Sequence, residues 1–167
     1  MGIRLVRVDY KNLLFYLKYV VRHKYYVFME CCKLGIPLTG AFHDIHKFTP
    51  GEMLGFEVYD DDLSILEDGI FRPAALATKR ADRAWFIHKR LSKHHWQYWV
   101  MPDEDIPGRL VISEMPMRYR KEMLADWRGA ASAMGNDVNK WYKKFRSNLI
   151  MGPKTRAWID ERMNYVE

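Results

Sequence analysis

The side chains of this sequence that could do chemistry are six histidines and a few carboxylates placed among apolar residues. The first histidine, His23, comes three residues after Val20 and four before Val27, on the apolar side of a predicted helix. Its ring is therefore expected to face inward, where it needs a hydrogen-bond partner or a metal ion. For His23 alone both readings stay open, a metal ligand or a core histidine bonded to a carbonyl group.

A histidine and an aspartate, His43 and Asp44, are adjacent on a predicted short helix. An imidazole nitrogen and a carboxylate oxygen are both ordinary ligands for zinc, manganese or iron. Lys47 follows His43 by four residues and would share its face on a continuous helix, where it could contact a phosphate. The alternative for Lys47 is a solvated helix surface.

Three further histidines are His88, His94 and His95. On a continuous helix His88 and His95 lie two turns apart, about 10 Å along the axis. That separation is too long for one metal ion, and suits either two ions or one ion plus a histidine that binds substrate. Because His94 and His95 would point in different directions, we expect only one of them to face the other histidines. Trp96 and Trp99 are expected to pack in the core.

Asp126 is expected on a face of small and apolar residues, three positions after Met123 and four before Ala130. A carboxylate is costly to bury there unless it is paired with a cation or bound to a metal ion. The alternative to a metal ion is a salt bridge to one of three basic residues, Arg22, Lys24 or Arg118.

Helices are the elements that must position these side chains. Apolar residues at steps of three and four predict helices over residues 8–34, 38–47, 74–99, 114–134, about 137–149, and within 150–167. A further helical turn is predicted at 50–52, and residues 57–73 are predicted to be an irregular acidic excursion. Only residues 110–113 resemble a strand, and they are too short to make a sheet. The predicted fold class is all-α, a single-domain bundle of five to seven helices.

Length and composition limit the kinds of protein this chain can be. Its 167 residues, 49% of them hydrophobic, predict one globular domain over residues 1–167. No run approaches the roughly 20 apolar residues of a membrane span and no signal peptide is recognised, so we expect a cytoplasmic protein without membrane contact. The net charge of +6 favours anionic partners, although no nucleic-acid-binding motif is found. The adjacent Cys31 and Cys32 are expected to be free thiols.

The order His, His-Asp, His, His-His, Asp along an all-α chain resembles that of the HD-domain metal-dependent phosphohydrolases. The chain looks more closely like an uncharacterised phage and bacterial family with the signature R-H-K-x-x-V, H-D-x-S-K-F-x-P-x-E, H-x5-H-H-x-x-Y-W and D-W. The corresponding segments here are residues 22–27, 43–52, 88–99 and 126–127. One departure is His46, which stands where that pattern has serine.

The resemblance implies an HD-domain-like core that holds one or two divalent transition-metal ions, of Mn, Fe, Co, Ni or Zn. A metal-activated water would attack a phosphoester, and Asp44 could bridge two ions. The implied metal ligands are His23, His43, Asp44, His88, His95 and Asp126. The implied catalytic residues are Asp44, Lys47, Glu52 and Glu122, the two glutamates as proton carriers. The groups expected to hold the phosphate are Lys47, Lys93, His94 and Arg156.

The leading hypothesis from the resemblance is a phosphohydrolase that acts on a nucleotide or a similar small phosphorylated substrate. One alternative is a mixed-valent di-iron oxygenase built on the same ligand set, which the additional histidines His88 and His95 keep open. Another is a non-catalytic nucleotide-binding or phage interaction protein. Self-association into a homo-oligomer is left open.

Overall fold

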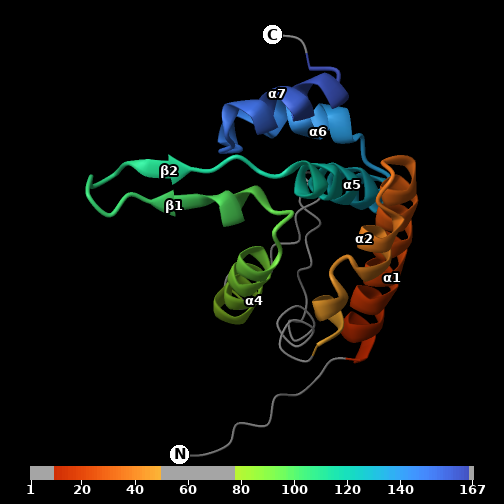
Figure 1. Cartoon of the computed structure of the whole chain (residues 1–167). Coiled ribbons are helices and arrows are strands. Elements are labelled where there is room, and N and C mark those ends of the chain that lie inside the picture. The colour runs from red at the N-terminus through yellow and green to blue at the C-terminus, as the bar shows by residue number, and fades with distance from the viewer. Residues whose placement is uncertain (1–9, 50–77, 166–167) are drawn as a thin grey trace, which may run out of the picture.

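A computed structural model describes residues 10–49 and 78–165 of the chain (Figure 1). Helix α1 (Tyr10–Lys33) is long and carries the predicted apolar stripe, with Val20, His23, Val27 and Cys31 all buried. It is followed by Gly35, whose φ of 73° lies in the left-handed region that ends many helices. The inward direction predicted for His23 is therefore confirmed.

Helix α5 (Met117–Met134) packs across α1 at a very close approach. A Cβ atom added to Gly129 would lie 2.5 Å from Cγ2 of Val27, so only glycine lets the two backbones come this near. His23 precedes Val27 by about one turn, and Asp126 precedes Gly129 by about one turn. The crossing therefore brings His23 and Asp126 face to face.

The prediction of a single helix over residues 38–47 is wrong, because the chain leaves the helical conformation at His43 and Asp44. Helix α2 (Pro37–Phe42) ends there and a 3-10 helix, η1 (Ile45–Phe48), begins after Asp44. His43 has extended backbone, and Asp44 has a φ of 49°, a left-handed conformation that aspartate tolerates better than most residues. The ammonium of Lys24 donates to the carbonyl oxygens of Ala41 and His43, at 2.8 and 2.9 Å, and holds this bend against α1.

The helix predicted over residues 74–99 is also interrupted. Helix α4 (Thr78–Leu91) stops at Leu91, a turn follows at residues 92–95, and the 3-10 helix η2 spans Trp96–Trp99. The indole N–H of Trp99 donates to the carbonyl of Lys93 at 2.8 Å. In a continuing α-helix that carbonyl would instead accept the backbone N–H of residue 97.

A short β-hairpin follows η2 and extends away from the helices (Figure 1). Strand β1 (Val100–Pro102) pairs antiparallel with β2 (Leu110–Ile112), with Val100 opposite Ile112. The expectation that residues 110–113 are too short for a sheet is therefore wrong. The sequence pattern offers no partner strand, because the predicted helix runs to residue 99 and Met101, Pro102 and Asp103 form the break after it.

The C-terminal helices pack on the side of α5 away from α4 (Figure 1). They are α6 (Val138–Phe145), the 3-10 helix η3 (Arg146–Asn148) and α7 (Pro153–Arg162). Asp137 caps α6 by accepting the N–H groups of Asn139 and Lys140. Together with α5 these helices enclose an apolar core, whose buried members are Met115, Met123, Leu124, Tyr142, Leu149, Ile159 and Met163. Trp96 and Trp99 pack against this core, as expected.

The described part of the chain is mostly helical, which confirms the all-α fold class. None of its helices has the length and apolar character needed to cross a membrane. Cys31 and Cys32 are both free thiols, the first buried and the second exposed. The helical turn predicted at residues 50–52, which includes Glu52, and the excursion predicted at residues 57–73 lie outside the described residues.

Candidate metal centre

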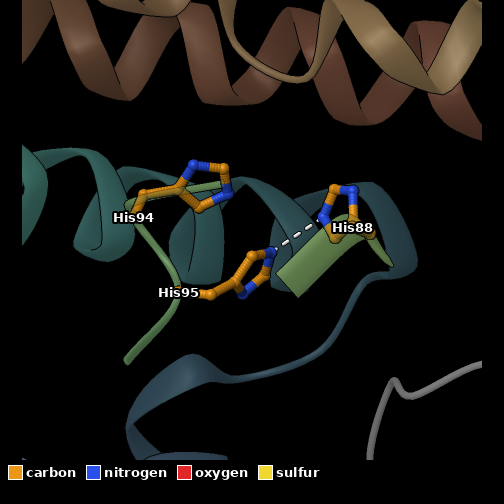
Figure 2. A group of neighbouring side chains, drawn as sticks. All are labelled: His88, His94 and His95. Atoms are coloured by element: carbon orange, nitrogen blue, oxygen red, sulfur yellow. Dashed lines mark hydrogen bonds between the residues drawn. The ribbon is translucent and has the colours of Figure 1, made fainter. Parts of the chain in front are cut away.

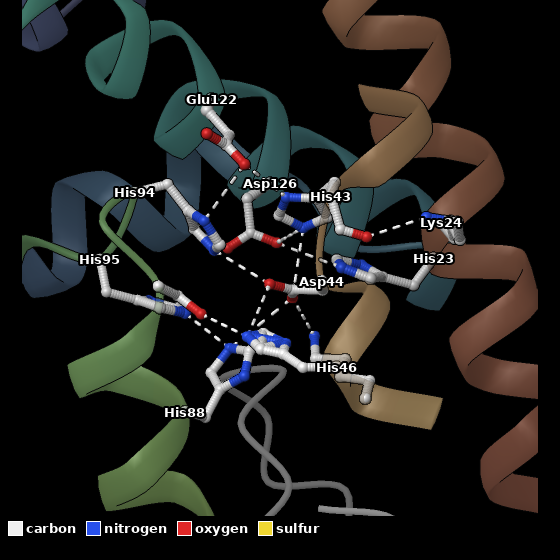
Figure 3. Close-up of polar contacts among 12 residues, drawn as sticks. His23, Lys24, His43, Asp44, His46, His88, His94, His95, Glu122 and Asp126 are labelled. Atoms are coloured by element: carbon white, nitrogen blue, oxygen red, sulfur yellow. Dashed lines mark hydrogen bonds and ion pairs between the residues drawn. The ribbon is translucent and has the colours of Figure 1, made fainter. Parts of the chain in front are cut away.

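Nine histidine and carboxylate side chains from four parts of the chain meet between α1, α5 and the end of α4 (Figure 3). We call this set the polar centre. Asp44 lies in its middle, between residues of α1 and α5 on one side and residues of α4 and its following turn on the other. The members of the polar centre are His23, His43, Asp44, His46, His88, His94, His95, Glu122 and Asp126.

The first group of possible metal ligands is His23, His43, Asp44 and Asp126, all buried. Nε2 of His23 lies 3.1 Å from Oδ1 of Asp126, and Nε2 of His43 lies 3.3 Å from the same oxygen. Nε2 of His43 is also 3.3 Å from Oδ2 of Asp44. Ligand atoms bound at about 2.0 to 2.2 Å around one ion lie about 2.8 to 3.6 Å apart. These spacings are therefore compatible with one shared cation.

The second group is His88, His94 and His95, shown in Figure 2. Nε2 of His88 and Nε2 of His95 are 2.8 Å apart. The expected 10 Å separation is wrong, because the turn at residues 92–95 folds His95 back toward α4. The expectation that only one of His94 and His95 faces the other histidines is wrong for the same reason, since both rings contact His88.

Asp44 connects the two groups. Its Oδ2 lies 3.3 Å from Nε2 of His43 and 3.6 Å from Nε2 of His88, while its Oδ1 lies 3.5 Å from Nε2 of His94. The left-handed backbone of Asp44 directs the carboxylate into this position. One carboxylate thus faces histidine nitrogens of both groups, which is the placement expected of a bridging ligand.

Several buried atoms of the polar centre have no hydrogen-bond partner among the described residues. They include Nε2 of His43, Nε2 of His94 and Oδ1 of Asp44. Each of these atoms faces an oppositely polarised atom at 3.3 to 3.5 Å without hydrogen-bond geometry. Buried polar atoms are normally paired, so the polar centre is unsaturated in a way that a cation could satisfy.

Positive neighbours keep the central aspartate ionised. Burial opposes the charge on Asp44, but the His43 ring and the Lys47 ammonium outweigh it and hold the pKa of Asp44 well below 3.8. The Lys47 Nζ atom lies 2.6 Å from Oδ2 of Asp44, and the positive charge of Lys47 is favoured in return, so that its pKa is raised.

The two carboxylates of α5 are ionised as well. Burial raises the pKa of Asp126, but its close contacts with the rings of His23 and His43 hold it well below 3.8. Burial likewise opposes the charge on Glu122, whose bonds from His43 and His94 lower its pKa from 4.5 to about 2. Three negative charges therefore converge in the polar centre.

The histidines of the polar centre differ in charge. Burial alone would lower the pKa of His43, but the charge of Asp44, the contact with Asp126 and the hydrogen bond to Glu122 raise it from 6.5 to about 10. Burial lowers the pKa of His23 and of His95, and positive neighbours lower each further. His23 and His95 are therefore neutral at pH 7, the form in which imidazole binds metal ions.

Asp126 does not form the salt bridge offered as the alternative to a metal ion. Its partners are His23 and His43. Lys24, one of the basic residues considered for it, instead bonds the backbone carbonyls of Ala41 and His43. Arg22 and Arg118 lie over the rings of Tyr26 and Tyr119.

The residues expected to hold a phosphate are placed differently from one another. Lys47 and His94 both contact Asp44 in the polar centre. Lys93 is exposed, with its Nζ 5.9 Å from the Tyr98 ring centroid. Arg156 on α7 donates to the carbonyl oxygens of Arg146 and Leu149 and so joins η3 to α7. Phosphate binding by Lys93 and Arg156 stays a prediction.

Two residues of the site were not expected from the sequence. Nε2 of His46 lies 2.8 Å from Oγ of Ser92 and 4.0 Å from Oδ1 of Asp44. A catalytic triad would need the serine and the aspartate on opposite nitrogens of the ring, whereas both lie nearest Nε2 here. Asp44, His46 and His88 could also hold a metal ion together. The closeness of His46 to Asp44 in the sequence could have indicated that His46 belongs to the site. No feature of the sequence indicates this for Ser92.

The chain matches a family over residues 12–165, which is nearly its whole length. That family is described as a family of unknown function, DUF5662. Searches of the curated proteins and of the solved structures give no match. Because the match covers far more than half of the residues, the chain belongs to the DUF5662 family.

Proposed function

We propose that this protein is a metal-dependent phosphohydrolase of the HD-domain type, acting on a nucleotide or a similar small phosphorylated substrate. The observation that carries the proposal is the pair of ligand groups on either side of Asp44, His23–His43–Asp126 and His88–His94–His95. Their residues follow the order of the HD-domain resemblance. Two ions about 3.5 to 4 Å apart with a bridging carboxylate are a recurrent device for phosphoester hydrolysis.

The donor atoms favour particular cations. Imidazole nitrogens with carboxylate oxygens suit Mn, Fe, Co, Ni or Zn. The nearby Cys31 is buried, and burial raises its thiol pKa to about 12, so it supplies no thiolate. A divalent cation in such a site lowers the pKa of a coordinated water and neutralises phosphoryl oxygens.

Lys47 supports the proposal from the substrate side. Its ammonium lies 2.6 Å from Oδ2 of Asp44, and its side chain is 15% exposed, so it is anchored in the polar centre with some access to solvent. A phosphate that approached ions held by Asp44 would come within reach of this positive charge. The net charge of +6 also favours an anionic substrate.

The test measures metal content and reaction together. The full chain, purified without chelator, is submitted to elemental analysis and assayed for phosphate release from a nucleotide panel with Mn, Co, Ni or Fe added. We expect one or two transition ions per chain and metal-dependent release. Asp126→Asn is the matched control, because it keeps the side-chain shape and removes one ligand charge; it should lose both metal and turnover.

Other results would reject the hydrolase. Iron with a coloured protein that consumes oxygen and releases no phosphate would favour the di-iron oxygenase, for which the three closely packed histidines His88, His94 and His95 are the supporting observation. Tight nucleotide binding without turnover in metal-loaded protein would favour a binding protein. Protein with neither metal nor turnover would reduce the polar centre to structural packing.

A further inference from the structure

Glu122 joins two histidines that belong to different ligand groups. Its Oε1 atom lies 3.2 Å from Nδ1 of His43 and 3.3 Å from Nδ1 of His94. All three side chains are buried, and they come from α5, the α2–η1 bend and the turn after α4 (Figure 3). One carboxylate oxygen thus faces the same nitrogen of two separate rings.

The opposite nitrogens of these two rings face the two oxygens of Asp44. Nε2 of His43 lies 3.3 Å from Oδ2, and Nε2 of His94 lies 3.5 Å from Oδ1. Glu122, His43, Asp44 and His94 therefore form a closed ring of contacts. Within this ring both Nε2 atoms lack a hydrogen-bond partner among the described residues, whereas both Nδ1 atoms face Glu122.

The ring of contacts determines which nitrogen of each histidine can bind a metal ion. An ionised carboxylate only accepts hydrogen bonds, so Nδ1 of His43 and Nδ1 of His94 must each carry hydrogen to bond it. Nε2 is then the atom of each ring that is left for a cation beside Asp44. Histidine ligands commonly donate their other ring N–H to a carboxylate, which orients the ring and raises its basicity.

We propose that Glu122 is a positioning residue that couples the two ligand groups, holding His43 and His94 with Nε2 turned toward opposite oxygens of Asp44. In this role Glu122 orients two histidine rings, whereas the sequence resemblance implies that it carries protons. The inference rests on the metal centre of the proposed function, and it is independent of which reaction follows. Its direct competitor is that Glu122 itself binds an ion with His43 and His94, whose ligand atoms are close enough for that.

The test is a calorimetric titration of the metal-free full chain with Zn²⁺, comparing wild type, Glu122→Gln and Glu122→Ala. Glu122→Ala should weaken the binding of both ions by about 10- to 100-fold, because both histidines lose their orientation. Glu122→Gln should lose less than about tenfold, because its amide oxygen still accepts from both N–H groups. Glu161→Ala, which removes a carboxylate whose side chain is 73% exposed, should bind as wild type.

Three titration results would overturn the coupling. Wild-type affinity in Glu122→Ala would show that the contacts of Glu122 with the two histidines do not contribute to metal binding. Loss of only one ion would show that Glu122 serves one group. A loss in Glu122→Gln as severe as in Glu122→Ala would make Glu122 a metal ligand. A wild-type chain that binds no Zn²⁺ would reject the metal centre itself, whereas absent phosphate release with normal Zn²⁺ binding would reject only the hydrolase.

A second measurement keeps the inference testable if Glu122→Ala does not fold. Long-range ¹H–¹⁵N correlation spectra of the Zn²⁺-loaded wild type and Glu122→Gln report which ring nitrogen of each histidine carries hydrogen. We expect hydrogen on Nδ1 and zinc on Nε2 for both His43 and His94. Zinc on Nδ1 of either ring would overturn the proposal.

Discussion

Helix α5 has two buried faces that differ in almost every respect. One face contributes Met123 and Leu124 to the apolar core with α6 and α7. The other contributes Glu122 and Asp126 to the polar centre with α1 and the end of α4. Both faces exclude water almost completely, since none of these four residues is more than 8% exposed.

The two regions satisfy their polar atoms differently. Beside the apolar core, the hydroxyl of Tyr142 donates to Asp160, and Arg146 donates to both oxygens of the same carboxylate. In the polar centre, Nε2 of His43 and Nε2 of His94 have no such partner among the described residues. Buried charge is costly unless it is fully paired, so the apolar core is complete by itself, whereas the polar centre could be completed by a cation.

The largest effect should come from breaking the polar centre at its middle. Asp44→Ala removes the carboxylate that faces both ligand groups, so metal uptake should fall below about a tenth of the wild-type level, the result expected when a shared charged ligand is lost. The helices should remain largely folded, because the apolar core is untouched. Elemental analysis and circular dichroism test this, and unchanged metal stoichiometry would refute the site.

The converse change breaks the apolar core and spares the polar centre. Leu124→Ala leaves a cavity in a fully buried site and should lower the free energy of unfolding by about 2 to 5 kcal/mol. Metal bound per folded chain should stay at the wild-type value, since Leu124 belongs to the apolar core and residues two apart on a helix lie on different faces. Urea denaturation and elemental analysis measure the two quantities, and a parallel loss of metal would show that the regions are not independent.

Acid should weaken the polar centre selectively. Folding lowers the pKa values of Asp44, Glu122 and Asp126. Each ionised carboxylate therefore stabilises the fold at pH values above its ordinary pKa, and this stabilisation is lost as the pH falls and the carboxylate becomes protonated. The free energy of unfolding of metal-free protein should therefore fall by about 1 to 3 kcal/mol between pH 4.5 and pH 2. Glu122→Gln should reduce this dependence, and Leu124→Ala should leave its slope unchanged. Equal slopes in wild type and Glu122→Gln would contradict the assignment.

The smallest effect is expected at His46. Its Nε2 is engaged by Ser92 and lies 4.0 Å from Asp44, farther than the other ligand contacts. His46→Ser should lose one partly buried hydrogen bond, about 1 kcal/mol of stability, and keep its full metal stoichiometry. Thermal unfolding and elemental analysis check this. Loss of an ion would instead place His46 among the ligands, with Asp44 and His88.

Local sequence patterns predicted the helices whose apolar stripes run without interruption. Val20, Val27 and Cys31 marked the buried side of α1, and the helix predicted over about 137–149 corresponds to α6 with η3. The patterns failed at residues 38–47 and 74–99, the two segments that carry most of the histidines. At the first break, the side chain of Lys24 bonds the carbonyl groups of Ala41 and His43. At the second, the side chain of Trp99 bonds the carbonyl group of Lys93. Such contacts leave no periodic signal.

The sequence by itself determined which donor groups the site can offer, because His23, His43, Asp44 and Asp126 supply the imidazole nitrogens and carboxylate oxygens that metal ions bind. Only the tertiary structure decided which atoms meet. Gly129 lets α5 approach Val27 closely enough for Asp126 to reach His23. Residues 79 positions apart, such as His43 and Glu122, come into contact because side-chain direction depends on how helices cross and where they break.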